Sequence, residues 1–426
     1  MRSNRRPLAL PLLALTLAVT SLAPASRPDS PAVYAEGVTV TADGQVVNVP
    51  VGAPASAAHP LWDGVVPGEG TRWEPMARRA MADLDVLTQD LGDGRKAAVA
   101  GWHRSWRYVW PRDASFVAAA YAVSGRHEDA FAVLRFVQDV QGDDGRWQAR
   151  YTADGAVPDD RGEQLDAVGW VLWSVWVWLE GARAQGLSDA DIEAGLAELR
   201  PMVVGATHGA IDAIDMRHAL PRPSQDFWEV PLRETSLGTA APVLVGLRAA
   251  SVLLPEMGER RLAATASAAG DLVSDGIAAQ FGRRGYPRLV TTREMDASVA
   301  FLMPPFTIAP PRHAEAFALA RTHLRTPQGG LRPGVEFKDR EISWTPQTAL
   351  FALAAAASGD TATATQYLDW LDAHRTNVGS LPEKVDGQGR PAAVAPLAWT
   401  AALVLLTLGA LDGDVPPPPG VGVQMR

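Results

Sequence analysis

The chain has 426 residues, of which 47% are hydrophobic and 20% are charged, and its formal net charge is −9. This composition supports a sizeable packed core and excludes an intrinsically disordered chain. The acidic balance, without a Lys/Arg-rich patch, argues against nucleic acid as a partner, and the lack of cysteine excludes disulfides, thiolate metal sites and a cysteine nucleophile.

Residues 1–25 have the pattern of a cleavable signal peptide. Three arginines within the first six residues form a basic start, an apolar run covers residues 8–18, and Ala23 and Ala25 have the spacing of a signal peptidase site. The apolar run is short for a bilayer span. We therefore expect a secreted protein that is free of the membrane after cleavage. An uncleaved membrane anchor is the alternative.

Residues 26–70 are expected to form a linker or a small β element. Polar and apolar residues alternate over 38–41 and 47–49, and residues 42–44 between them, Ala-Asp-Gly, suit a hairpin turn.

From residue 71 to residue 412 the pattern is helical, and we expect an all-α domain there. Ala/Leu-rich stretches with helical periodicity alternate with loops marked by Gly, Pro and Asp. The expected helices cover residues 72–90, 112–124, 127–140, 163–185, 188–216, 235–253, 259–281, 294–303, 312–325, 344–357, 361–375 and 394–411. About twelve helices paired in sequence give six hairpins, which predicts an (α/α)6 barrel. Residues 413–426 are Pro-rich and are expected to be a disordered tail.

Five of the expected loops are long, and they concentrate Trp, Arg, Asp and Glu. These loops cover residues 141–161, 217–234, 282–293, 326–343 and 376–393. Long loops on a rigid helical scaffold usually carry binding and catalysis, so we expect the site among them. The spacing of Trp170, Trp173 and Trp176 within the helix over 163–185 indicates core packing instead.

The first candidate site segment is Trp110-Pro111-Arg112-Asp113, at an expected helix start. Aromatic faces pack against sugar rings, and an Arg-Asp pair supplies donors and acceptors for neighbouring hydroxyls. The alternative is structural: Asp113 complements the helix dipole and Trp110 belongs to the core.

Two glutamates in long loops are candidates for acid and base catalysis. Glu229 directly follows Trp228, and an apolar neighbour favours the protonated form that a general acid needs. Glu383 follows a proline in the loop before the last helix. The alternatives are a helix-start glutamate for Glu229 and a surface glutamate paired with Lys384 for Glu383.

Four segments in this order resemble the signature stretches of glycoside hydrolase family 15, the glucoamylase family. The similarity extends over roughly residues 70–411. The four stretches are Trp110-Pro111-Arg112-Asp113, Gln164-Leu165-Asp166, Phe227-Trp228-Glu229, and Leu381-Pro382-Glu383 with Pro396-Leu397-Ala398-Trp399.

The resemblance implies a role for each matching residue. Glu229 matches the general acid and Glu383 the general base of an enzyme that cleaves α-glucosidic bonds with inversion, without metal or organic cofactor. The residues expected to bind the sugar are Trp110, Arg112, Asp113, Asp166, Trp228 and, by a loose similarity around Leu331-Arg332, Arg332. The expected substrate is an α-glucan or α-gluco-oligosaccharide, and we expect a monomer.

The chain also departs from the family pattern. Val230 stands where many members have a second glutamate, and residues 159–161, Asp-Asp-Arg, stand where some have an aromatic residue. Linkage preference therefore stays open among α-1,4, α-1,6 and α,α-1,1 bonds. Two other readings stay open: a trehalase-type enzyme or polysaccharide lyase on the same scaffold, and a carbohydrate-binding protein without catalysis.

Overall fold

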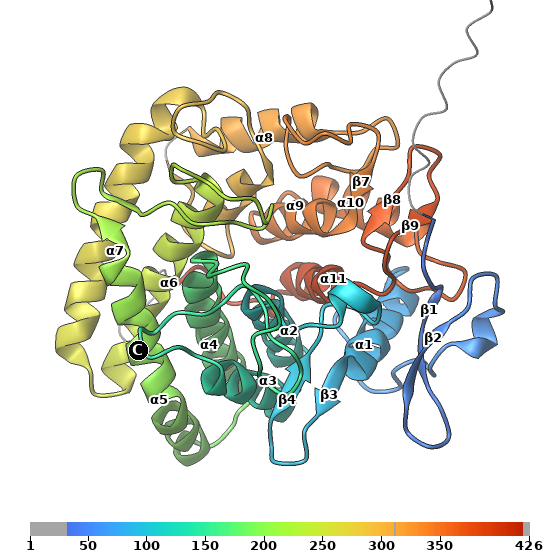
Figure 1. Ribbon diagram of the computed structural model, residues 1–426. Helices are drawn as coiled ribbons and strands as arrows, with labels where there is room; N and C mark the ends of the chain where they lie inside the picture. The colour runs from blue at the N-terminus through green and yellow to red at the C-terminus, as the bar shows by residue number, and fades with distance from the viewer. Residues whose placement is uncertain (1–31, 311, 421–426) are drawn as a thin grey trace, which may run out of the picture.

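A computed structural model describes residues 32–310 and 312–420 of the chain. The expected signal peptide, residues 1–25, lies outside the described residues. Helices dominate, and the strands are short (Figure 1).

Six helices form a closed inner ring. They are α2 (Pro111–Val123), α4 (Asp166–Ala184), α6 (Leu237–Glu256), the 3-10 helix η4 (Ala297–Leu302), α9 (Thr345–Ala357) and α11 (Ala398–Asp412). Each packs against the next in this order, and α11 packs back against α2, which closes the ring.

Six further helices surround this ring. They are α1 (Glu74–Leu87), α3 (His127–Asp139), α5 (Asp189–Asp212), α7 (Arg260–Gln280), α8 (His313–Leu324) and α10 (Thr361–Ala373). Each outer helix packs against an inner one, as α7 does on α6 and α10 on α9. The two rings, visible in Figure 1, confirm the predicted (α/α)6 barrel.

One inner position is shorter than predicted. The sequence predicts a helix over 294–303, and the structure has η4 at Ala297–Leu302. The Asp296 side chain accepts a hydrogen bond from the Ser298 N–H at 3.0 Å and caps the start of η4, while Pro304 and Pro305 follow its end. Proline lacks the N–H that an α-helix needs, so the segment stops after about two turns.

The inner helices are buried because they are apolar on all sides. Helix α6 is long and apolar enough to cross a membrane, but 83% of its most apolar window is buried inside the protein. A Cβ atom placed on Gly169 of α4 would lie 1.9 Å from the carbonyl oxygen of Pro242 in α6. Only glycine allows these two helix backbones to approach so closely.

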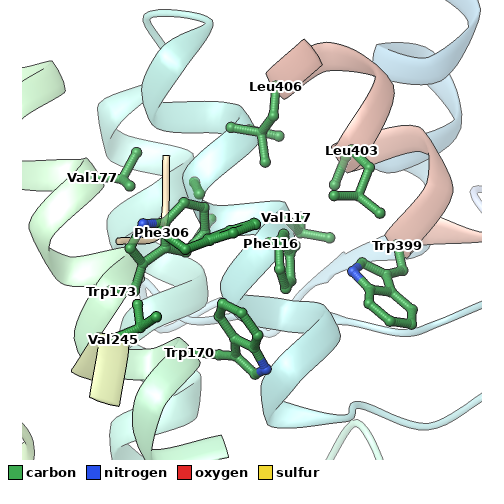
Figure 2. Packing of buried hydrophobic residues seen from close by; sticks show 14 of the residues in the cluster. Phe116, Val117, Trp170, Trp173, Val177, Val245, Phe306, Trp399, Leu403 and Leu406 are labelled. Atoms are coloured by element: carbon green, nitrogen blue, oxygen red, sulfur yellow. The ribbon is translucent and has the colours of Figure 1, made fainter. Parts of the chain in front are cut away.

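Aromatic side chains fill the interior of the ring. Phe116 packs against Trp170, Trp173 and Trp399, with ring centroids 5.0, 5.3 and 5.8 Å apart, and Phe306 joins the same cluster (Figure 2). The prediction that the tryptophans of α4 are core residues is confirmed, since Trp170 and Trp173 are at most 1% exposed.

Short antiparallel strands form small sheets in the segments before and between the helices. They are β1 (Gly37–Val40) with β2 (Val46–Val49), β3 (Thr88–Asp90) with β4 (Lys96–Ala98), β5 (Ile214–Asp215) with β6 (Leu220–Pro221), and β7 (Ser343–Trp344) with β8 (Lys384–Val385) and β9 (Pro391–Ala392). The remaining 3-10 helices are η1 (Ala55–Ala57), η2 (Arg104–Trp106) and η3 (Gly282–Arg284). Register pairs Val38 with Asn48 in the β1–β2 hairpin, whose turn falls at the expected residues 42–44.

The Pro-rich segment after α11 differs from the expected disordered tail over the part that is described. Pro418 and Pro419 are buried, and the Pro417 carbonyl accepts a hydrogen bond from Trp176 Nε1 at 3.4 Å. Proline rings are apolar and pre-ordered, so little entropy opposes this packing. Residues 421–426 lie outside the description.

Candidate active site

A cavity of about 180 Å³ opens where the N-terminal ends of inner helices meet. Its lining comes from the loops that enter α2, α6, α9 and α11 and from the first turns of α2, α9 and α11. The lining residues are Ala100, Trp106, Trp110, Arg112, Asp113, Phe227, Trp228, Glu229, Pro333, Phe337, Trp344, Pro346, Gln347, Glu383, Leu397 and Trp399. Helix N-termini carry partial positive charge, so they favour the acidic side chains gathered there.

The start of α2 supplies a buried arginine with several fixed partners. Arg112 donates from Nε to Asp113 at 3.1 Å and from Nη1 to Gln164 at 2.9 Å and to Asp166 at 3.2 Å. Its guanidinium also lies over the Trp399 ring, 5.2 Å from the centroid. These contacts fix the guanidinium in one orientation at the cavity wall.

Burial and neighbouring charges shift the pKa values of Arg112 and Asp113 in opposite directions. Burial disfavours the charged guanidinium, but the carboxylates of Asp113, Asp166 and Glu229 raise the pKa of Arg112 above its ordinary value. Burial raises the pKa of Asp113 to about 6, although Arg112 opposes the shift. Arg112 is therefore a permanent donor, while Asp113 changes its charge within the range of mildly acidic pH.

Glu229 sits at a sharp turn in the loop before α6. Its φ angle is 55°, in the left-handed region that residues other than glycine rarely adopt. The turn is held by Asp226, whose carbonyl accepts from the Glu229 N–H at 2.8 Å and whose side chain accepts from the Trp228 N–H at 2.9 Å. Such strain, roughly 1–3 kcal/mol, commonly marks a functional position.

Both oxygens of the Glu229 carboxyl have partners. Oε1 accepts from Trp110 Nε1 at 2.6 Å, and Gln164 Nε2 lies 3.4 Å away. Oε2 accepts from Arg161 Nη1, and this contact is also an ion pair. The carboxyl is thus held at the cavity surface with its side chain 29% exposed.

A buried ionic cluster supports this loop from behind. Arg288 donates to both carboxylate oxygens of Asp226 at 3.1 Å and lies 3.5 Å from Asp296. The Trp228 ring stacks on the same guanidinium at 3.9 Å. All three charged side chains are at most 6% exposed, and burial raises the pKa of Asp296 to about 7.

Glu383 directly precedes strand β8 of the three-stranded sheet, which holds its backbone at the cavity. Its N–H donates to the Val394 carbonyl at 2.8 Å, and its own carbonyl accepts from the Thr345 N–H at 3.0 Å. Oε1 accepts a long hydrogen bond, 3.4 Å, from Trp106 Nε1. Oε2 makes no hydrogen bond within residues 32–310 and 312–420 and lies 3.5 Å from Lys384 Nζ.

Burial determines the proton affinity of Glu383. The residue is 8% exposed, and this burial raises the pKa of its carboxyl above 4.5, while Lys384 acts in the opposite direction and the charge of Glu229 adds to the rise. A carboxylate with a raised pKa is a better proton acceptor once it is ionised.

Most residues predicted from the sequence line this one cavity, and two do not. Trp110, Arg112, Asp113, Trp228, Glu229 and Glu383 are all lining residues. Asp166 is fully buried behind the wall and contacts Arg112. The expected contact of Arg332 with the sugar stays a prediction; in the structure its guanidinium donates to the His323 carbonyl at 3.2 Å and its N–H to the Leu324 carbonyl at 3.0 Å. Arg332 thereby caps the end of α8 and lies outside the lining.

The structure adds residues that the sequence analysis did not select. Trp106, Trp344 and Trp399 line the cavity, and Arg161, which is not a lining residue, contacts the Glu229 carboxyl. Their signal in the sequence is weak, since aromatic residues near loops are common, although Trp399 stands inside one of the family-like stretches. No group of three or more His, Asp or Glu side chains arranged to hold a metal ion occurs in the described part of the chain.

No protein-family model matches the chain. Among characterised proteins, it is 25% identical to an isomaltose glucohydrolase of Kribbella flavida over 386 residues, which cover 82% of this chain and 95% of that protein. It is 29% identical to an uncharacterized glycosyl hydrolase of Methanocaldococcus jannaschii over 100 residues, or 24% of this chain and 16% of that protein's length.

Solved structures share the fold over about four fifths of the chain. A glycosidase superposes with a TM-score of 0.67 and 23% identity, covering 81% of this chain and 98% of that one. The glucoamylase from Saccharomycopsis fibuligera gives 0.64 and 12%, covering 83% and 98%. A bacterial glucoamylase complexed with acarbose gives 0.65 and 17%, covering 80% and 56%. The fold is thus that of glucoamylases and related glycosidases.

Proposed function

We propose that this protein is an inverting glycoside hydrolase that releases glucose from the non-reducing end of short α-glucosides. One observation carries the proposal: Glu229 and Glu383, held by separate elements, line the same small cavity together with the Arg112–Asp113 pair. The isomaltose glucohydrolase and glucoamylase relatives support a glucoside as substrate. One solved structure of the similar glycosidase, a glutamate-to-alanine variant, is in complex with glucose. This supports glucose as the sugar that the cavity of the present protein binds.

The size of the cavity favours action at a chain end. Its volume of about 180 Å³ is below the roughly 300–1,000 Å³ of pockets for drug-sized ligands. One pyranose ring suits this space, whereas a continuous polysaccharide needs an open groove. Trp110, Trp228 and Trp399 offer apolar faces for the ring. Arg112 donates to one sugar hydroxyl while Asp113 accepts from the next.

The two glutamates then share the proton transfers. Glu229 gives its proton to the glycosidic oxygen as the bond from that oxygen to the anomeric carbon breaks. A water molecule attacks the anomeric carbon from the opposite face and passes its proton to Glu383, whose Oε2 has no competing hydrogen bond among the described residues. Inversion requires a water between the two carboxylates, at a separation of roughly 6.5–9.5 Å.

Proton NMR during digestion tests the proposal directly. Maltose, isomaltose, trehalose and methyl α-glucoside are incubated with the protein, and the first anomer released is recorded. We expect β-glucose to appear before α-glucose. Glu229→Gln and Glu383→Gln should each lower kcat about 100- to 10,000-fold, the usual contribution of a general acid or base. Glu193→Gln, on the exposed face of α5, is the matched control and should leave the rate unchanged.

The same experiment separates the other readings. If α-glucose is released first, the protein is a glycosidase but does not act by inversion. Binding of oligosaccharides without turnover of any α-glucoside would indicate a carbohydrate-binding protein. Unsaturated uronates released from polyuronates, seen by ultraviolet absorbance, would indicate a lyase.

A further inference from the structure

We propose that Arg161 belongs to the subsite of the leaving group, where it exchanges its bond with Glu229 for bonds to the hydroxyls of the departing sugar. The inference rests on the proposed hydrolase function and adds a residue that determines which leaving groups are accepted. Its basis is the ion pair between Arg161 Nη1 and Glu229 Oε2.

The bonding of the Glu229 carboxyl leaves one oxygen for catalysis. Oε1 is bound by Trp110 Nε1 at 2.6 Å, and Trp110 is only 6% exposed and directly precedes helix α2, so this bond is fixed. A catalytic acid must direct an O–H group at the glycosidic oxygen. That group has to be on Oε2, which is the atom that Arg161 contacts. Arg161 and the glycosidic oxygen therefore compete for the same atom.

Arg161 is able to leave Glu229 without becoming an unpaired charge. Its side chain is 34% exposed, and its Nε lies 3.3 Å from Asp159 Oδ2. Asp159 is itself held by Arg150, which is buried and donates to the Ser105 carbonyl at 2.9 Å. The guanidinium can therefore turn about its bond to Asp159 while its charge stays compensated.

The backbone of Arg161 stays in place during this movement. Gln225 Nε2 donates to the Arg161 carbonyl at 2.5 Å, and Gln225 is in the loop that carries Glu229. The movement is thus confined to the side chain. Because the chain of Arg161 is anchored to the loop of the acid, its guanidinium remains within a few ångströms of the glycosidic oxygen.

The chemistry of this position fits a sugar leaving group. The atom that protonates the glycosidic oxygen is next to the ring carbons of the departing sugar, so a guanidinium displaced from it meets the neighbouring hydroxyls. Guanidinium has five donors and no acceptor, and hydroxyl oxygens accept from it. A leaving group without hydroxyls offers no such partner, so the contribution of Arg161 should depend on the leaving group.

Three substrates separate this role from the others. A glucose disaccharide needs acid catalysis and has leaving-group hydroxyls, methyl α-glucoside needs acid catalysis but lacks them, and α-glucosyl fluoride needs little protonation. We expect Arg161→Ala to lower kcat/KM for the disaccharide about 10- to 100-fold, the loss for one hydrogen bond to a charged group. The values for methyl α-glucoside and the fluoride should stay within about fivefold, the most that loss of a partly exposed ion pair is expected to cost. Arg222→Ala, which removes a nearby ion-paired arginine of similar exposure, is the control and should affect none.

Other patterns overturn the proposal. Equal losses on the disaccharide and methyl α-glucoside would mean that Arg161 only positions Glu229. Equal losses on all three substrates would mean a structural role. If the wild-type protein turns over none of them, the proposed function fails, and the proposal about Arg161 is then decided by binding.

The binding measurement uses calorimetry in a Glu383→Ala background, which lacks the proposed base. Adding Arg161→Ala should weaken binding of the disaccharide about 10-fold or more and leave glucose binding unchanged. Unchanged disaccharide affinity would overturn the proposal, and so would an equal loss for glucose.

Discussion

Replacing Arg288 by methionine should destabilise the protein strongly, because two buried carboxyls depend on this one cation. Arg288 donates to both oxygens of Asp226 and lies 3.5 Å from Asp296, and all three side chains are at most 6% exposed. Methionine keeps an unbranched apolar side chain but removes the guanidinium, and with it the charge and the stacking on Trp228.

The size of the effect follows from the burial. Removing one partner of a buried ion pair costs about 3–5 kcal/mol, since a charge is left without compensation. With about 390 described residues and about 2.1 cal/mol/K of unfolding entropy per residue, this corresponds to a decrease in Tm of roughly 4–6 °C.

The effect should also depend on pH. The pKa of Asp296 is already about 7 in the folded protein, against 3.8 ordinarily, and Arg288 lowers it. Without Arg288 this pKa rises further, so the folded state loses stability as pH increases above the ordinary value. At pH 5.5 the carboxyl is protonated in the folded protein with or without Arg288, and the loss should be smaller than at pH 8.

Differential scanning calorimetry at pH 5.5 and pH 8 measures both points. Arg248→Met is the matched control, because Arg248 pairs with Asp271 at 2.8 Å on the surface, where the two side chains are 29% and 68% exposed. Such a pair contributes about 0–1 kcal/mol, so its Tm should fall by about 1 °C or less. If the decrease in Tm for Arg288→Met at pH 8 is no larger than for this control, Arg288 does not compensate the two buried carboxyls. If the decrease is the same at pH 5.5 and pH 8, the protonation of Asp296 does not contribute to it.

Three further predictions concern the site and the helix packing. Trp110→Phe keeps the ring but removes the N–H bound to the acid, so kcat/KM for a disaccharide should fall about 10- to 100-fold while α-glucosyl fluoride hydrolysis is retained; equal losses on both substrates would contradict this. Because burial raises the pKa of Glu383 and only its ionised form accepts a proton, activity should fall on the acidic side at a pH above 4.5. Lys384→Met removes a cation that lowers this pKa, so the acidic limb of the kcat/KM profile should move to higher pH, and an unmoved limb would count against Glu383 as the base. Gly169→Ala should destabilise by about 1–3 kcal/mol in denaturant unfolding because its Cβ meets the backbone of α6, whereas Gly270→Ala in α7, with its nearest neighbour at 3.5 Å, should stabilise by about 0.5–1 kcal/mol.

The helices could be predicted from the sequence because their signals are local. Apolar periodicity and the breaks at Gly, Pro and Asp placed all twelve positions of the barrel. Ring closure is not local, since it depends on contacts between α11 and α2, nearly three hundred residues apart. Pairing twelve helices into six hairpins predicts a closed ring, and the structure shows the packing of α11 on α2 that closes it.

The sequence motifs predicted which residues gather at the site, but not which of their side chains face the cavity. Motifs selected Arg112, Glu229 and Glu383, which all line it. Spacing along the chain cannot tell the direction of a side chain. The structure places Asp166 behind Arg112 and Arg332 at the end of α8, and neither is among the residues that line the cavity.

Arg161 could not be selected from the sequence. Its partner Glu229 is 68 residues away, and the pairing exists only because the fold brings their two loops together. The predictions of a signal peptide and of a monomer concern properties that the fold does not test, and they stay predictions.

The position of α11 has a consequence for the way the chain reaches its native state. This helix is apolar all round and packs against α1, α2 and α9, so it closes the inner ring and is the last of the barrel helices in chain order. Without α11, the apolar faces of those three partners have no cover and the inner ring stays open. A chain shortened within α11 should therefore aggregate instead of forming a smaller barrel.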